Sequence, residues 1–326
     1  LGNTVSPEEM IELYGADTVR LFILFAANPT AGMDWSDTAL EANYRVMLQL
    51  RTMPETILNW GNDNSEIDNW LIARLKQRVA EFNQAMDTYD LRRAVEISHY
   101  ELIKDINWYT RRGGNNSTVG RTILESWTYL ISVSTPHLAE EWGRCLGWQQ
   151  MVSASQMKNV EPVTSAEENL LDYEFTMRNV LENARKVKTI AQKHLGGEAQ
   201  SLTLIVAPEW KNQLSRAAIT YLNDGGNVKQ FIQVLKEMDF VNESNKGEIL
   251  AYWNKRMLSQ VFKWDDKSKS LILDEINELK VLSDRAEFIA GELDLGEVVV
   301  VTAENYPGDD GRENSALPLN PSIVFA

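Results

Sequence analysis

Three histidines and one cysteine are the residues of this sequence that could most readily support catalysis. His99, His137 and His194 are far apart along the chain, so a three-histidine metal site would require three separate elements to converge. Cys145 has no histidine close to it in sequence, which favours a small buried hydrophobic residue over a nucleophile. Motifs such as GxGxxG, GxxxxGK[ST], GxSxG and HExxH are absent. We therefore expect no catalytic residue and no metal ligand in this chain.

One short lysine–serine run superficially resembles a nucleotide-binding loop. Lys267-Ser268-Lys269-Ser270 follows two aspartates, but no glycine-rich strand–turn–helix precedes it, as phosphate-cradling loops require. We interpret this run as a solvated loop.

Local basic charge is the remaining functional signal. The stretch from Arg178 to Lys193 contains five basic residues and one acidic residue, and a helix with this bias could follow a phosphate backbone. A solvated face that also compensates the C-terminus of its helix is an equally good interpretation. For Arg111-Arg112, which two glycines follow, the helix-end interpretation is favoured. Arg92-Arg93 falls in a first helical turn, where positive charge is unfavourable, so a carboxylate or a phosphate should pair with it.

Length and charge limit the classes of protein to which the chain can belong. Its 326 residues suggest about two domains, and 32 basic against 47 acidic residues give a net charge of −15. This charge argues against indiscriminate binding to DNA or to a membrane surface, and no apolar run approaches the roughly 20 residues of a membrane span. We expect a cytoplasmic protein. The start without Met indicates a fragment or a processed chain.

Periodic apolar residues predict helices over the first two thirds of the chain. Leu71, Leu75, Val79 and Phe82 form one such stripe, while Ser36 and Asp90 are suited to cap helices. Short turns between the predicted helices indicate an antiparallel bundle. The predicted helices cover about 6–14, 17–27, 36–60, 90–112, 117–132, 136–146 and 165–194, with one more after the turn at 61–65 that carries Leu71 to Met86.

The last third has a different pattern. Leu202–Val206 and Val298–Val301 are β-branched runs typical of strands. Helical stretches are predicted between them, and the tail from 306 to 321 is expected to be loop. The fold class is therefore mainly α, a helix bundle followed by a small α/β domain. The helical stretches cover about 209–222, 228–238, 246–262 and 274–293.

Several motifs together resemble a known family. Leu1-Gly2-Asn3 with the following residues, and then Tyr14-Gly15-Ala16-Asp17, are similar to the segment after the KMSKS loop of class I aminoacyl-tRNA synthetases. Pro136-His137-Leu138-Ala139-Glu140-Glu141 resembles a second motif of these enzymes, and weaker matches extend to the C-terminus. The likeness is greatest to leucyl-tRNA synthetases of the archaeal and eukaryotic cytosolic type.

The resemblance implies three parts. Residues 1–35 would be the strap that follows the catalytic loop, 36–160 the helical anticodon-binding-type domain, and 161–326 a connecting helix with an α/β domain that contacts tRNA. The HIGH motif, the KMSKS lysine and the editing domain are absent from this sequence, so Gly2 and Asn3 would be a remnant beside the nucleotide loop. ATP with Mg would serve the complete enzyme, and no cofactor is expected in this chain.

The expected function is therefore to bind and orient tRNA within a leucine–tRNA ligase whose catalytic domain lies in the same or a separate chain, the 326 residues alone being inactive. Phosphate contacts would come from Arg185, Lys186 and Lys188, and then from Arg111 and Arg112. The alternative is a stand-alone interaction module that docks a separate synthetase half or another protein.

Overall fold

The computed structural model describes residues 5–26, 32, 34–195 and 198–326. The chain divides into two compact units, Leu1–Leu171 and Asp172–Ala326, and each is described by itself. Gly2 and Asn3 of the sequence prediction lie outside the described residues.

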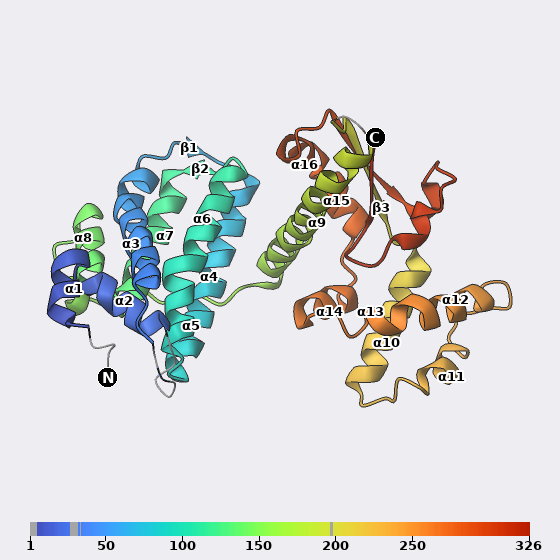
Figure 1. The fold of residues 1–326 in the computed structure, drawn as a ribbon, viewed down its shortest axis with the longest axis horizontal. Coiled ribbons are helices and arrows are strands. Elements are labelled where there is room, and N and C mark those ends of the chain that lie inside the picture. Colours follow the sequence, from blue (N-terminus) through green and yellow to red (C-terminus); the bar gives the residue numbers. More distant parts are fainter. Residues whose placement is uncertain (1–4, 27–31, 33, 196–197) are drawn as a thin grey trace. The chain divides into compact units, whose positions relative to one another are not determined.

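Unit 1 is a bundle of antiparallel helices (Figure 1). The long helices α3, α4, α6 and α7 pack side by side, as the sequence predicts. Ser36 accepts a hydrogen bond from the Ala39 amide at the start of α3, and Asp90 accepts one from the Arg93 amide at the start of α5, so both predicted caps are confirmed. The elements are α1 (Pro7–Tyr14), α2 (Ala16–Ala26), α3 (Asp37–Leu58), β1 (Asn62–Asp63), α4 (Glu66–Asp87), α5 (Leu91–Glu96), a π-helical turn (Ile97–Glu101), α6 (Leu102–Arg111), β2 (Asn115–Asn116), α7 (Ser117–Ser132), α8 (Pro136–Cys145) and a 3₁₀ turn (Val152–Ala154).

The core of unit 1 is built from aromatic and aliphatic side chains of α3, α4, α6, α7 and α8. Trp127 and Trp142 are fully buried and meet edge to face, with ring centroids 5.0 Å apart. Each buried indole N–H has a carbonyl acceptor, Ser98 for Trp127 and Leu50 for Trp142, so burial leaves neither polar group unsatisfied.

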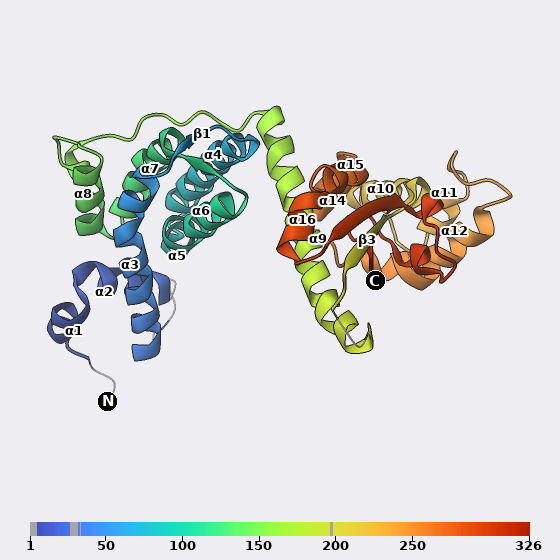
Figure 2. The same ribbon diagram turned by 90° about the horizontal axis from the view of Figure 1, so that it is seen from above.

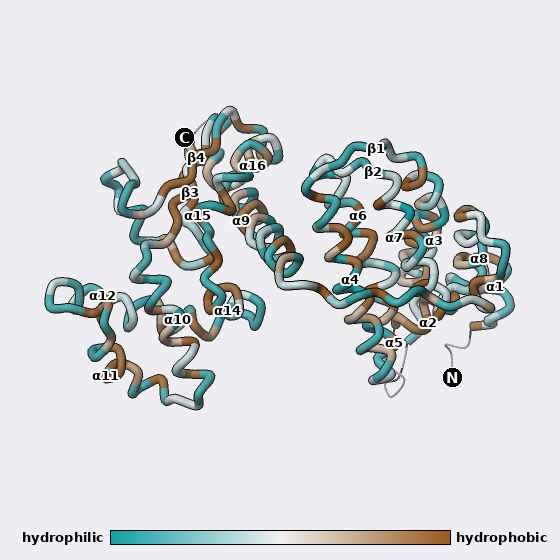
Figure 3. Tube along the Cα trace, turned by 180° about the vertical axis from the view of Figure 1, so that it is seen from behind, coloured by the Kyte–Doolittle hydropathy of each residue, from teal (hydrophilic) through white to brown (hydrophobic). Residues whose placement is uncertain are grey.

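Unit 2 places helices around a three-stranded sheet (Figure 2). The strand order is β4-β3-β5, with β3 parallel to β4 in the register Leu202↔Val298 and antiparallel to β5 in the register Leu202↔Phe325. Strands β3 and β4 are largely hydrophobic, as their brown colour in Figure 3 shows. The elements are α9 (Ser165–Leu195), β3 (Ser201–Val206), α10 (Glu209–Asn223), α11 (Phe231–Leu235), α12 (Lys246–Tyr252), a π-helical turn (Trp253–Met257), α13 (Leu258–Gln260), α14 (Asp266–Leu273), α15 (Glu278–Ser283), α16 (Ala286–Glu292), β4 (Glu297–Thr302), 3₁₀ turns (Ala303–Asn305, Arg312–Ser315) and β5 (Ser322–Phe325).

Two local predictions for unit 2 are wrong, and one strand was not predicted. The lysine–serine run at 267–270 forms the first turns of α14, because Asp265 caps this helix by accepting from the Ser268 amide at 2.7 Å. The helix predicted at 274–293 is two short helices, α15 and α16. No element was predicted after residue 321, where strand β5 pairs with β3.

Candidate functional site

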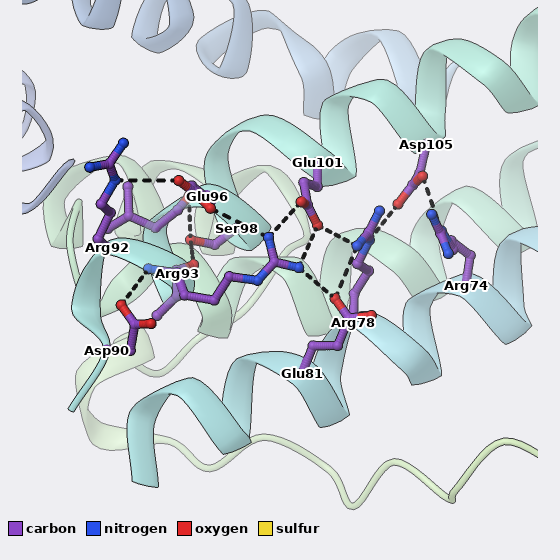
Figure 4. Close-up of polar contacts among 12 residues, drawn as sticks. Arg74, Arg78, Glu81, Asp90, Arg92, Arg93, Glu96, Ser98, Glu101 and Asp105 are labelled. Carbon is purple, nitrogen blue, oxygen red and sulfur yellow. Dashed lines mark hydrogen bonds and ion pairs between the residues drawn. The ribbon is translucent and has the colours of Figure 1, made fainter. Parts of the chain in front are cut away.

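Seven charged side chains form an ion-pair cluster across α4, α5, the π turn and α6 (Figure 4). Arg78 is its centre: its Nε lies 2.8 Å from an Asp105 oxygen, and its Nη1 pairs with Glu81 at 3.0 Å and with Glu101. The π turn carries Glu101 toward α4. The cluster comprises Arg74, Arg78, Glu81, Arg93, Glu96, Glu101 and Asp105.

The cluster and its neighbours provide carboxylate partners for Arg92 and Arg93. Arg93 pairs with Glu101 at 2.6 Å and with Glu81 at 3.0 Å, and Arg92 pairs with Glu96 at 3.4 Å. Burial favours a raised pKa for Glu101, but the hydrogen bond from Arg93 and the charge of Arg78 hold its pKa below the ordinary value. Carboxylates therefore satisfy these arginines within the bundle.

His99 and His137 lie in different surroundings. His99 is fully buried, with Nδ1 2.8 Å from the Ser98 hydroxyl and Nε2 3.0 Å from the Thr135 hydroxyl. Burial lowers the pKa of His99 to about 3, so the ring is neutral at pH 7. His137 lies instead at an exposed position on α8. Among the described residues no group of three His, Cys, Asp or Glu side chains could hold a metal ion.

Cys145 is exposed, so the prediction of a buried residue is wrong. The neighbouring Leu146, Ala139 and Trp142 occupy the buried side of this segment, and Cys145 at the end of α8 is left on its outer side.

Arg111 and Arg112 lie at one end of the bundle, where α6 ends. Arg111 is exposed over Trp108, its guanidinium carbon 5.8 Å from the ring centroid, and Arg112 is half-buried. Gly113, with φ of 85°, ends the helix. The short β1–β2 ladder, with register Asn62↔Asn116, closes the same end and was not foreseen.

A buried hydrogen-bond network fixes that end of the bundle. The Tyr109 hydroxyl donates to Asp68 at 2.6 Å and accepts from the Asn116 amide at 3.1 Å, and the Asn116 side chain donates to Asp68 at 3.0 Å. Burial favours a raised pKa for Asp68, but these donors, with the Ser65 amide, lower its pKa overall. The starts of α4 and α7 are thereby held against the end of α6, which gives Arg111 and Arg112 a rigid base.

The three basic residues predicted to bind phosphate from α9 differ in their contacts. Arg185 pairs with Glu292 of α16, and the Lys188 ammonium donates to the Leu293 carbonyl. Lys186 is exposed, makes no ion pair within the described residues, and lines a pocket of about 680 Å³ with Asn179 and Gln260. Of the three, Lys186 is therefore the one best placed to bind an external phosphate.

Sequence reasoning missed a pocket of about 800 Å³ in unit 1, formed by α4, α7 and the segment after α8. Tyr129 and Trp148 provide its aromatic wall, with ring centroids 5.2 Å apart. Trp148, at the start of an irregular, glutamine-rich segment, was the available signal.

The two most specific sequence motifs contact each other in the fold. Asp17 of α2 accepts from the Leu138 amide at 2.8 Å, and its other oxygen lies 2.9 Å from His137 Nδ1. These residues are 120 and 121 positions apart in sequence. Asp17 therefore binds the first turn of α8 and ties the N-terminal helices to the bundle.

Comparison with known proteins agrees with this architecture. Residues 68–200 match the family model of the anticodon-binding domain of tRNA ligase. A leucine–tRNA ligase of Archaeoglobus fulgidus is 27% identical over 326 residues, which are 100% of this chain and 32% of that protein. One of Methanococcus vannielii is 29% identical over 322 residues, 97% of this chain and 31% of that protein. Over nearly its whole length, this chain is similar to archaeal leucine–tRNA ligases.

The chain spans about a third of the length of the leucine–tRNA ligases that it matches. The matches to these ligases and to the anticodon-binding domain confirm the resemblance that the Tyr14–Asp17 and Pro136–Glu141 motifs indicated. A crystal structure of the Agrobacterium radiobacter K84 agnB2 LeuRS–tRNA–LeuAMS complex aligns with 52% of this chain and 22% of that one, at 20% identity and a TM-score of 0.43. That likeness is too slight to carry an argument.

Proposed function

We propose that this chain binds and orients tRNA as part of a leucine–tRNA ligase. The observation that carries the proposal is the match of residues 68–200, most of the bundle, to the anticodon-binding domain of tRNA ligase. The alternative of a stand-alone docking module is not favoured, because the relatives are leucine–tRNA ligases over the whole of this chain.

Arg111, Arg112 and Lys186 are the proposed phosphate contacts. Contacts to phosphates fix the position of a nucleic acid without reading its sequence, which suits a part of the enzyme that orients its substrate. Arg185 and Lys188 contribute indirectly, since both hold α9 against the segment at the end of α16.

In the complete ligase, the catalytic domain, ATP and Mg would belong to parts outside residues 1–326. Residues 1–35 would act as the strap, 36–160 as the tRNA-binding bundle and 161–326 as the outer tRNA-contacting domain, with the cytoplasm as the place of action. No described helix has the length and apolar character needed to cross a membrane.

Filter binding of the full chain to tRNA tests the proposal. Arg111→Glu with Arg112→Glu should weaken binding at low salt, because two positive charges near the phosphates become negative. Lys229→Glu with Lys236→Glu is the matched control, since it makes the same change in charge at exposed positions on either side of α11. An equal loss of tRNA affinity in both double variants would show a response to net charge only. If the unaltered chain did not bind tRNA at all, the proposed function would be wrong.

A further inference from the structure

The 800 Å³ pocket of unit 1 has the size of a ligand site, since small-molecule pockets usually enclose about 300–1,000 Å³. Ile72 and Leu75 of α4 supply apolar surface, and Tyr129 of α7 with Trp148 supplies two aromatic rings. Glutamine side chains at 149, 150 and 156 line it as well. An apolar and aromatic interior with a few amides is typical of a site for a flat, polar-edged ring.

Hydrogen bonds hold the irregular wall of the pocket in place. Glu140 of α8 accepts from the amides of Val152 at 3.0 Å and Ser153 at 3.2 Å, and these donors lower the pKa of Glu140 despite the opposing effect of burial. The Tyr129 hydroxyl donates to the Ser155 hydroxyl at 3.2 Å. The pocket is therefore preformed, which reduces the ordering that a ligand must impose.

Both lysines that line the pocket have carboxylate partners. Among its lining residues, Lys76 pairs with Glu167 at 2.7 Å and Lys158 pairs with Glu125 at 3.5 Å. Both lysines are thus paired, and the lining also includes the Glu161 carboxylate, which accepts from the Asn159 side chain. The interior therefore disfavours a phosphate and suits an uncharged group better. Amide side chains can donate and accept in one plane, as the edge of a nucleobase requires.

We propose that this pocket captures one unstacked base of the bound RNA. The base would stack on the exposed part of Trp148 or Tyr129, and the glutamine amides would bind its edge. Single-stranded loops and ends are the parts of an RNA whose bases can be turned out onto aromatic side chains. This inference rests on the proposed function, which brings RNA to unit 1.

Fluorine NMR of the full chain labelled with 5-fluorotryptophan tests the proposal. The chain has ten tryptophans, and the Trp148→Phe variant identifies the Trp148 signal by its loss. Addition of tRNA should shift that signal, whereas a fully paired duplex RNA should leave it unchanged. The Trp148→Ala variant should bind tRNA about ten-fold more weakly. Tyr89→Asn is the matched control, because Tyr89 is an aromatic residue of unit 1 that is 81% exposed and does not line the pocket.

The outcomes separate this inference from the proposed function. A Trp148 signal that stays unchanged while filter binding shows a tRNA complex would overturn the pocket and leave the function intact. A shift with free nucleoside monophosphates but none with tRNA would show that the pocket binds free nucleotides, and it would overturn the proposal that the base belongs to a bound RNA. Absence of any tRNA complex would overturn both proposals.

Discussion

Arg78 shows how single residues determine the stability of unit 1. Its side chain is only 9% exposed, and it contacts Asp105, Glu101 and Glu81, of which Asp105 is itself 2% exposed. Burial opposes the charge of Arg78, but Asp105 and Glu101 raise its pKa overall. Removing one partner from such a cluster leaves buried charges without compensation.

Arg78→Met should therefore lower the free energy of unfolding by about 3–5 kcal/mol, as measured by urea denaturation. Arg45→Met is the matched control, because the Arg45–Glu41 pair is 77% and 52% exposed and such pairs contribute about 0–1 kcal/mol. Similar losses in both variants would contradict a central role for Arg78.

The neutral His99 gives the fold a dependence on pH. Its pKa is about 3 in the fold and about 6.5 when unfolded, so between these values only the unfolded chain binds the proton, and stability falls as pH falls. From pH 7 to pH 5 this group should remove about 2 kcal/mol. The His99→Gln variant should not show this part of the fall in stability. The measurement is the difference in the free energy of unfolding between the two proteins at each pH. Parallel curves for both proteins would contradict this, because they would mean that His99 has the same pKa in the folded and the unfolded chain.

Sequence could predict some of these residue roles and not others. A carboxylate partner for Arg92-Arg93 was foreseeable, because like charges in a first helical turn need compensation. The partners of Arg185 and Lys188 lie 107 and 105 positions away, and no local pattern reports such a pairing. The exposure of Cys145 depends on which side of α8 faces the bundle, which only the packing determines.

At the level of elements, the two units share one type of helix end. Gly114 donates to the Tyr109 carbonyl at 2.9 Å, and Gly226 donates to the Tyr221 carbonyl at 2.9 Å. In each case the preceding glycine has a φ near 80° and the second glycine lies against the tyrosine ring. Each helix therefore ends in a Schellman motif.

Gly114→Ala should destabilise the chain by about 2–3 kcal/mol, because an added Cβ would lie 2.3 Å from the Tyr109 ring and displace the hydroxyl that binds Asp68. Gly113→Ala is the control: it meets no neighbouring atom, and its φ of 85° should cost about 1 kcal/mol. Thermal unfolding of both variants measures the difference. A larger effect at Gly113 would mean that backbone conformation, not the tyrosine contact, dominates at this position.

Helices with a local signal were predictable, and elements that depend on distant pairing were not. Helix α7 begins and ends at the predicted residues 117 and 132, since its cap and apolar period are local. Strand β5 exists through its pairing with β3, whose residues lie about 120 positions earlier, and no local pattern predicted it. The division of 274–293 into α15 and α16 likewise follows from packing, with Val281, Leu282 and Ile289 buried in different helices.

On the scale of the whole chain, the net charge of −15 opposes RNA, so binding must depend on a few local cations. If both units contact one tRNA, Lys186→Glu and the Arg111→Glu/Arg112→Glu pair should each reduce affinity, and their free-energy losses should add because the residues share no partners. The slope of log affinity against log salt should become shallower by up to about 0.7–0.9 for each phosphate contact removed. Filter binding at four salt concentrations measures both quantities. Loss of affinity with an unchanged slope would mean that these side chains act through the fold and that the phosphates are contacted elsewhere.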